Sequence, residues 1–135
     1  LGTPDEVYNN PANIFVAGFI GSPPMNLIKG ELQNGVFIGP NTRAKTQSKD
    51  SRKNIVLGIR PEDIAVGAPG ESHLNSKLYS LEPTGDQTLV AAWSGEQLVV
   101  AKATRTFRQA LDTPIGLNFD AERIFLFDEV TGNRL

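Results

Sequence analysis

Short apolar runs with a period of two, separated by turn residues, constrain the fold of this chain more than any other feature. Alternation of this kind is typical of β-strands with one buried face. No helical pattern of about 10–15 residues separates the runs, so a parallel sheet with crossover helices is a poor fit. The sequence predicts a mainly β fold, a small barrel or sandwich, with strands in Met25–Gly30, Val36–Ile38, Ile55–Ile59, Leu78–Leu81, Leu89–Trp93, Leu98–Ala101, Ile115–Phe119 and Ile124–Phe127.

The turns between these runs carry their own signals. Asn34-Gly35 is the strongest short hairpin signal that a sequence can carry, because both residues tolerate positive φ. Ser94-Gly95 and Pro83–Asp86 are suited to tight reversals between neighbouring strands. We therefore expect consecutive strands to pair as antiparallel hairpins.

Two short helices are predicted before the first strand. Thr3–Glu6 matches a capping box, with a proline at the first helical position. Pro11 ends this helix, and Ile14–Ile20 gives the second one a broad apolar surface that ends at Gly21. We expect residues 1–24 to form a helical junction and residues 25–135 to form a β domain.

The composition is that of an ordinary globular domain, with 39% hydrophobic residues, 21% charged residues and a net charge of −2. Without cysteine, the chain has no disulfide, thiolate zinc site, iron–sulfur cluster or cysteine nucleophile. The longest apolar run, Ile14–Ile20, is much shorter than the roughly 20 residues of a membrane-spanning helix. The first residues lack the basic flank and apolar core of a signal peptide, and we expect the chain to begin within a longer protein.

Motifs for phosphate binding or catalysis are missing from the sequence. It contains no G-x-x-x-x-G-K-[ST], no G-x-G-x-x-G and no G-x-S-x-G. His73 is the single histidine and lies among turn residues, so we expect a solvated loop histidine. The acidic pairs Asp5-Glu6, Glu62-Asp63 and Asp128-Glu129 are explained by helix capping and by strand ends. We predict no catalytic, cofactor or metal site in this chain.

Two features bear on nucleic-acid binding. Trp93, Phe107 and Phe15 could stack on bases, but the apolar strand around Trp93 indicates a place in the core or in an interface, and core burial is favoured over base stacking. The segment Arg43–Lys53 holds five basic residues and one acidic residue, and we expect a solvated loop there rather than a contact with an acidic partner. The net charge of −2 argues against a dedicated nucleic-acid binder.

Several short motifs in fixed order resemble the region that follows the ATPase domain in ATP-binding cassette (ABC) sugar-importer subunits, such as the maltose and glycerol-phosphate importer ATPases. Thr84 and Ala121 stand where that family often has leucine and proline, departures that weaken no functional assignment. The segment Arg43–Lys53 aligns with no family motif. The matching motifs are Gly2–Tyr8, Pro11–Asn13, Phe15–Ala17, Phe19–Pro23, Met25-Asn26, Gly58–Asp63, Glu82–Asp86, Phe119–Arg123 and Leu126–Asp128.

The resemblance implies a C-terminal regulatory domain with an oligonucleotide/oligosaccharide-binding (OB) type barrel, of the transport-associated OB (TOBE) kind. The parent protein would hydrolyse ATP with Mg²⁺ in a domain before Leu1, at the inner face of the membrane, to drive uptake of sugars, polyols or glycerol phosphate. Its partners would be a second copy of itself, membrane-spanning permease subunits and, in some relatives, a regulatory protein.

The resemblance also suggests which residues meet those partners. Arg60, Pro61, Glu62 and Asp63 would form part of the polar rim of a dimer interface, with Pro61 also fixing the backbone. Asn13, Phe15 and Phe19 would pack the short helices against the ATPase domain. The remaining rim residues would be Glu82, Gly85 and Asp86, of which Gly85 would also fix backbone geometry.

Two other functions stay open at this point. One is a free-standing domain that binds an oxyanion such as molybdate, since transport-associated barrels are related in shape to such domains. The other, less favoured, is an OB-fold binder of single-stranded nucleic acid.

Overall fold

The computed structural model describes residues 11–14 and 23–135, so the two predicted N-terminal helices, apart from residues 11–14, lie outside the described residues. The described part is mainly β, as predicted, and two three-residue 3₁₀ helices, η1 (Pro61–Asp63) and η2 (Ala121–Arg123), join its strands. None of its helices is long and apolar enough to cross a bilayer. The strands are β1 (Asn26–Gln33), β2 (Val36–Gly39), β3 (Thr42–Lys45), β4 (Arg52–Ile59), β5 (Ile64–Gly67), β6 (Leu74–Pro83), β7 (Gln87–Ser94), β8 (Gln97–Thr104), β9 (Pro114–Phe119) and β10 (Phe125–Asp128).

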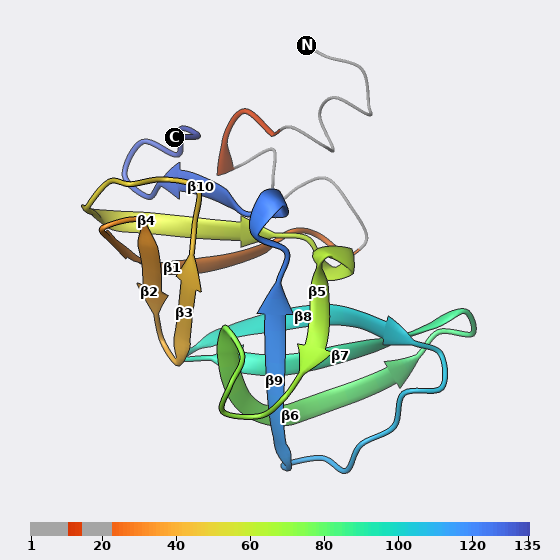
Figure 1. The fold of residues 1–135 in the computed structure, drawn as a ribbon. Coiled ribbons are helices and arrows are strands. Elements are labelled where there is room, and N and C mark those ends of the chain that lie inside the picture. Colours follow the sequence, from red (N-terminus) through yellow and green to blue (C-terminus); the bar gives the residue numbers. More distant parts are fainter. Residues whose placement is uncertain (1–10, 15–22) are drawn as a thin grey trace.

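The strands form one continuous antiparallel sheet in the order β10-β4-β1-β2-β3-β6-β7-β8, while β9 pairs with β6 and β5 pairs with β9. The sheet folds over on itself. In Figure 1, β10, β4 and β1 lie in an upper layer, β6, β7 and β8 lie in a lower layer, and β5 and β9 run between them. The predicted mainly β fold is confirmed, and the sheet is open, with β10 and β8 at the two ends of its strand order.

The Asn34-Gly35 turn is confirmed as the connection between β1 and β2. Its two central residues have φ values of 50° and 80°, the positive values that a two-residue hairpin requires. Gln33 and Val36 are register partners directly beside the turn. The local sequence therefore sets the register of the first hairpin.

The core lies between the two layers and is built from the inward residues of alternating strands. In β7, Thr88, Val90, Ala92 and Ser94 have no exposed surface, whereas Trp93 points outward. The largest fully buried side chains include Phe37, Ile28, Leu32, Ile55, Leu57, Ile59, Leu74, Leu78, Ile115 and Leu117. Burial of this apolar surface is the main driving force for the fold.

A side-chain amide connects the two layers where β8 passes β1. The Asn26 Nδ2 group donates to the Val100 carbonyl oxygen at 2.8 Å, and Asn26 Oδ1 accepts from the Val100 N–H at 2.8 Å. Nδ2 also donates to the Ile59 carbonyl oxygen at 3.1 Å. The Asn26 amide thus takes the place of a neighbouring strand for the backbone of Val100.

Two strands were not predicted from the sequence. β3 lies largely within the segment Arg43–Lys53, which was expected to be a solvated loop, and β4 begins at Arg52, so the loop prediction holds only for residues 46–51. In β3, Thr42 and Ala44 are buried and alternate with exposed Arg43 and Lys45. Small inward side chains carry this alternation, so a search for hydrophobic runs misses it. β5 was also missed, because it has only four residues between η1 and the following turn, too few for a clear alternation.

The described N-terminal residues pair with the C-terminal end of the chain. Asn13 and Asn133 form an antiparallel bridge, and the Ile14 N–H donates to the Gly132 carbonyl oxygen at 2.9 Å. Ile14 packs against a second, smaller core cluster of Met25, Val56 and Phe127. Residues 12–14 are therefore held by the end of the chain and by this cluster.

Candidate functional site

The two predicted rim segments lie on different turns of the fold. Arg60–Asp63 connects β4 to β5, and Glu82–Asp86 closes the β6–β7 hairpin. In Figure 1 this hairpin extends outward to the right, away from η1. The two turns therefore do not form one compact site.

The first turn is built by proline. Pro61 occupies the first position of η1, and Arg60 before it has the extended backbone that precedes proline. The Asp63 N–H donates to the Arg60 carbonyl oxygen at 2.9 Å, which closes the turn. Arg60 is only 3% exposed and Pro61 is also buried, which corrects the expectation of an exposed rim for these two residues. The expectation failed because β4 ends in an uninterrupted run of buried residues that continues into Arg60.

Two acidic residues of this turn remain accessible. The Glu62 carboxylate lies 3.7 Å from the Lys102 ammonium on β8, which ties η1 to the lower layer. Burial raises the pKa of the Asp63 carboxyl, and the neighbouring carboxylates of Glu62 and Asp120 raise it further, whereas Arg123 acts against them. Whether either residue contacts a second copy of the chain stays a prediction.

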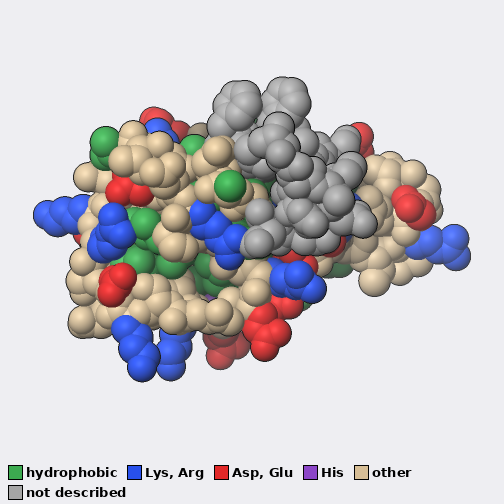
Figure 2. Space-filling view, turned by 90° about the horizontal axis from the view of Figure 1, so that it is seen from above, with side chains coloured by type: hydrophobic (Ala, Val, Ile, Leu, Met, Phe, Trp, Pro, Cys, Tyr) green, Lys and Arg blue, Asp and Glu red, His purple; other side chains and the backbone are tan. Residues whose placement is uncertain are grey.

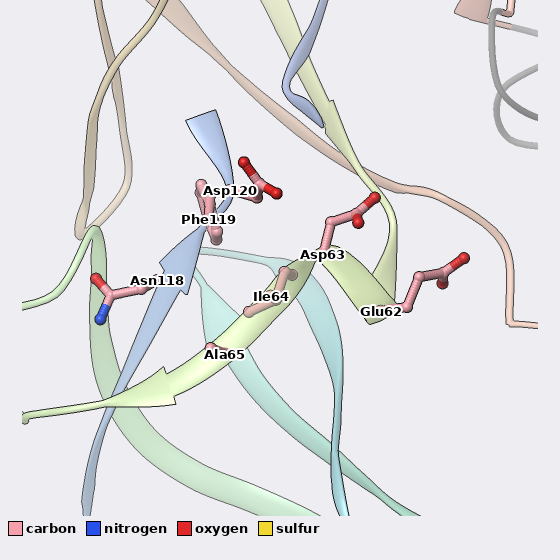
Figure 3. Close-up of a pocket in the computed structure, with 7 residues that line it drawn as sticks. All are labelled: Glu62, Asp63, Ile64, Ala65, Asn118, Phe119 and Asp120. Atoms are coloured by element: carbon pink, nitrogen blue, oxygen red, sulfur yellow. The ribbon is translucent and has the colours of Figure 1, made fainter. Parts of the chain in front are cut away.

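Beside η1 lies a shallow hollow of about 340 Å³, lined by Glu62, Asp63, Ile64, Ala65, Asn118, Phe119 and Asp120. Figure 3 shows the carboxylates of Asp63 and Asp120 on the same side of the hollow, with Glu62 extending away from them. The Asp120 N–H donates to the Asp63 carbonyl oxygen at 2.9 Å, so the two 3₁₀ turns are held side by side.

The chemistry of this hollow is acidic and does not suit an oxyanion, which requires cationic or N–H donors. In the part of the chain that the structure describes, no group of three or more histidine, cysteine, aspartate or glutamate residues is arranged to hold a metal ion. The hollow therefore supports neither the molybdate alternative nor metal-dependent chemistry.

The second turn is exposed and fixed by local hydrogen bonds. The Thr84 N–H donates to the Gln87 carbonyl oxygen at 2.8 Å, and the Thr84 hydroxyl lies 3.3 Å from the Asp86 carboxylate. Gly85 has a φ of +102°, a conformation that other residues rarely adopt, and open space lies where a Cβ would stand. Gly85 is thus explained by backbone geometry, whereas Glu82 and Asp86 remain exposed at this end of the hairpin.

The predicted contact with an ATPase domain involves three residues, of which the structure describes only Asn13. Phe15 and Phe19 lie outside the described residues. Asn13 is half-buried and pairs with Asn133 at the C-terminal end.

His73 is more than the solvated loop histidine that was expected. Its Nδ1 atom accepts a hydrogen bond from the Phe119 N–H at 2.8 Å, and its ring lies 5.6 Å from the Phe119 ring. The His73 carbonyl oxygen accepts from the Arg43 N–H at 2.8 Å. Burial lowers the pKa of His73. The side chain therefore ties the loop before β6 to the end of β9.

The expectation that Trp93 is a core residue was wrong. Trp93 is 38% exposed on the outer side of β7, and its ring meets that of Tyr79 edge to face with centroids 5.2 Å apart. The even spacing of Val90 and Ala92 could have revealed this, because it places Trp93 on the opposite face of the strand.

The face that Figure 2 shows has no charge pattern that favours nucleic acid. On the face that Figure 2 shows, lysine and arginine side chains lie at separate places among acidic ones and do not form a stripe. Arg52, one of the basic residues of the segment Arg43–Lys53, is paired with Asp128 at 3.1 Å.

Two family models match the chain in sequence order. The MalK OB fold domain matches residues 21–64, and the TOBE domain matches residues 57–127, which is more than half of the chain. Together they cover the strands from β1 to nearly the end of β10.

Curated relatives match over nearly the whole chain. The ABC transporter ATP-binding protein YcjV of Escherichia coli is 36% identical over 141 residues, which cover 97% of this chain and 39% of that protein. The sn-glycerol-3-phosphate import ATP-binding protein UgpC of Escherichia coli and of Shigella sonnei is 34% identical over 144 residues, covering 100% of this chain and 40% of UgpC. The chain thus spans about two fifths of the length of these relatives.

A solved structure shares the fold. The cytoplasmic molybdate-binding protein ModG, in a crystal form with molybdate bound, superposes with a TM-score of 0.54 over 80% of this chain and 97% of ModG. The sequences are 7% identical, so this likeness concerns the fold alone.

Proposed function

Because the chain belongs to the TOBE domain family, with a segment of the MalK OB fold type before it, we propose that it is the regulatory and dimerisation domain of an ABC importer ATP-binding subunit. The importer would carry sugars, polyols or glycerol phosphate. The observation that carries this proposal is the collinear match of both family models together with the relatives' names, all of which are ABC transporter or import ATP-binding proteins.

In this proposal the chain itself is not catalytic. ATP and Mg²⁺ would be bound by an ATPase domain of the same protein, because the 135 residues of this chain contain no phosphate loop. Asn13, Phe15 and Phe19 would face that domain. The close pairing of residues 12–14 with the C-terminal end supports a fixed attachment at this point.

The proposed partners are a second copy of the protein, the membrane-spanning permease subunits and a regulatory protein. The protein would then lie on the cytoplasmic side of the membrane, bound through the permease. Glu62, Asp63, Glu82 and Asp86 remain candidates for the polar rim of the domain contact, since all four retain accessible surface. Arg60 and Pro61 would support the turn from within.

The gene that encodes this chain tests the proposal directly. We expect G-x-x-x-x-G-K-[ST] roughly 200 residues before Leu1, within a domain of strands alternating with helices. The full-length protein should hydrolyse ATP, and replacing the lysine of that motif should abolish the activity. A gene without such a domain, or a full-length protein that does not bind ATP, would contradict the proposed function.

A further inference from the structure

Residues 46–51, which connect β3 to β4 and which we call the clamp loop, are bound to the Asn34-Gly35 turn. The Gly35 N–H donates to the Asp50 carbonyl oxygen at 2.9 Å. The Gly35 carbonyl oxygen accepts from the Thr46 N–H at 2.9 Å and from the Thr46 hydroxyl at 2.6 Å. Both backbone groups of Gly35 are therefore held by this loop.

The clamp loop also covers Gly35, which is buried although it lies in a turn. A Cβ on this residue would clash with the carbonyl oxygen of Ser48, so only glycine allows so close an approach. The loop keeps its shape through its own hydrogen bonds. The Ser48 N–H donates to the Thr46 hydroxyl at 3.2 Å, and the Asp50 N–H donates to the Ser48 hydroxyl at 3.1 Å.

Asn34, in contrast, is exposed to water. Its N–H donates to the Ser51 hydroxyl oxygen at 2.9 Å, and its side-chain oxygen accepts from the same hydroxyl at 3.3 Å. The turn thus combines an accessible asparagine side chain with a following peptide nitrogen that is buried and hydrogen-bonded.

These two groups can react with each other. The Gly35 nitrogen attacks the Asn34 Cγ atom, a bond forms between them, and the side-chain nitrogen leaves as ammonia with the proton of the Gly35 N–H. Water then opens the cyclic imide. Breaking the bond from the Gly35 nitrogen to Cγ gives aspartate, and breaking the bond to the main-chain carbonyl carbon gives isoaspartate.

The sequence places this chemistry at one position. Asn34-Gly35 is the single Asn-Gly pair of the chain, and glycine has no side chain that shields its nitrogen from the preceding residue. In the folded chain the Gly35 N–H must first leave the Asp50 carbonyl oxygen, which requires the clamp loop to open. Loops whose residues are largely exposed open more readily than the strands of a core.

We propose that Asn34 is a site of spontaneous conversion to aspartate and isoaspartate, and that the clamp loop sets the rate by holding the Gly35 N–H. This inference concerns the β domain alone and does not depend on the proposed function. Isoaspartate adds one carbon to the main chain of a turn that sets the register of β1 and β2. Because Phe37 of β2 is fully buried, the modified chain should be less stable.

Peptide mapping by mass spectrometry tests the site. Trypsin cuts after Lys29 and Arg43, so one peptide, residues 30–43, contains both Asn34 and Asn41. Asn41 precedes threonine and serves as the internal control. We expect the mass gain of deamidation at Asn34, at least about tenfold slower in the folded chain than in guanidinium chloride at the same pH and temperature.

Two variants loosen the clamp loop without changing Asn34 or Gly35. Thr46→Val and Ser48→Ala should each accelerate the conversion about fivefold in the folded chain and leave the rate in guanidinium chloride unchanged. Thr84→Val is the matched control, because the Thr84 hydroxyl donates to the Gln87 carbonyl oxygen at 3.1 Å in a distant turn. It should leave both rates unchanged. Circular dichroism checks that each variant is folded, and Ser48→Ala decides if Thr46→Val is not.

Three results would overturn the inference. Equal rates in the folded and the unfolded chain would show that the clamp loop gives no protection. A folded Ser48→Ala chain that converts no faster than the original would separate the loop from the rate. A mass gain at Asn41 instead of Asn34, or none in guanidinium chloride, would remove the site itself.

Discussion

His73 makes the stability of the described fold depend on pH. Its Nδ1 atom accepts from the Phe119 N–H, so this nitrogen carries no proton in the folded chain. Burial lowers its pKa below the value of 6.5 in an unfolded chain. The unfolded chain therefore binds more protons as the pH falls below about 6.5, and folding loses stability in that direction.

We expect the free energy of unfolding to decrease between pH 7.5 and pH 5 through His73. His73→Asn keeps an acceptor near the position of Nδ1 but does not titrate, so its stability should depend less on pH over this range. His73→Leu should lose about 1 kcal/mol at pH 7.5, because the Phe119 N–H loses its acceptor. Urea unfolding followed by Trp93 emission measures all three proteins. A His73→Asn variant as sensitive to pH as the original chain would refute this role.

The elements of the sheet are joined by a few side chains, and Asn26 is the one that bridges its layers. Its amide makes three hydrogen bonds, two of them with Val100, although Asn26 is only 6% exposed. Such a buried amide is costly unless every group is paired, and here pairing is achieved by a residue of β1 reaching the backbone of β8.

We expect Asn26→Ala to destabilise the domain by about 2–4 kcal/mol, because the N–H and carbonyl of Val100 lose their partner. Hydrogen exchange at the Val100 amide should accelerate more than at the neighbouring Val99 amide. Gln33→Ala, an exposed residue at the end of the same strand, is the control and should change stability by less than about 0.5 kcal/mol. Equal effects of both substitutions would show that Asn26 does not connect the layers.

At the scale of elements, strands with several large inward side chains were predictable, whereas β3, with small inward side chains, and β5, with only four residues, were not. The alternation of Ile55, Leu57 and Ile59 predicts β4, and Asn34-Gly35 predicts the hairpin of β1 and β2. Both predictions succeed because hydrophobic alternation and turn chemistry are local signals. The inward residues of β3 are the small side chains Thr42 and Ala44, which give no hydrophobic run in the sequence. The burial of Arg60 depends on how the end of β4 meets the rest of the sheet, which the local sequence does not determine, whereas the spacing of Val90 and Ala92 already places Trp93 on the outward face.

For the molecule as a whole, the order of short motifs identified the domain although no single motif is specific. The family matches over residues 21–64 and 57–127 confirm the resemblance that these motifs suggested. The site could not be predicted to the same extent, since a contact surface leaves no catalytic motif in a sequence.

We expect the chain of 135 residues neither to bind nor to hydrolyse ATP. Phosphate binding requires a cradle of backbone N–H groups with a lysine, and the sequence contains no glycine followed by lysine. Isothermal titration calorimetry with Mg²⁺ and ATP should show no saturable heat. Saturable binding at micromolar concentration would contradict the assignment of all nucleotide chemistry to another domain.

The pairing of residues 12–14 with the C-terminal end links the described start of the chain to its last strand. A displacement of residues 12–14 would be passed to the end of the chain, because these residues hold Gly132 and Asn133 by backbone contacts. The neighbouring Arg134 and Leu135 lie along β10, and β10 pairs with β4 in the upper layer. The last four residues thus lie between residues 12–14 and β10, and a chain shortened by them would lose the backbone contacts that residues 12–14 make with Gly132, Asn133 and Arg134.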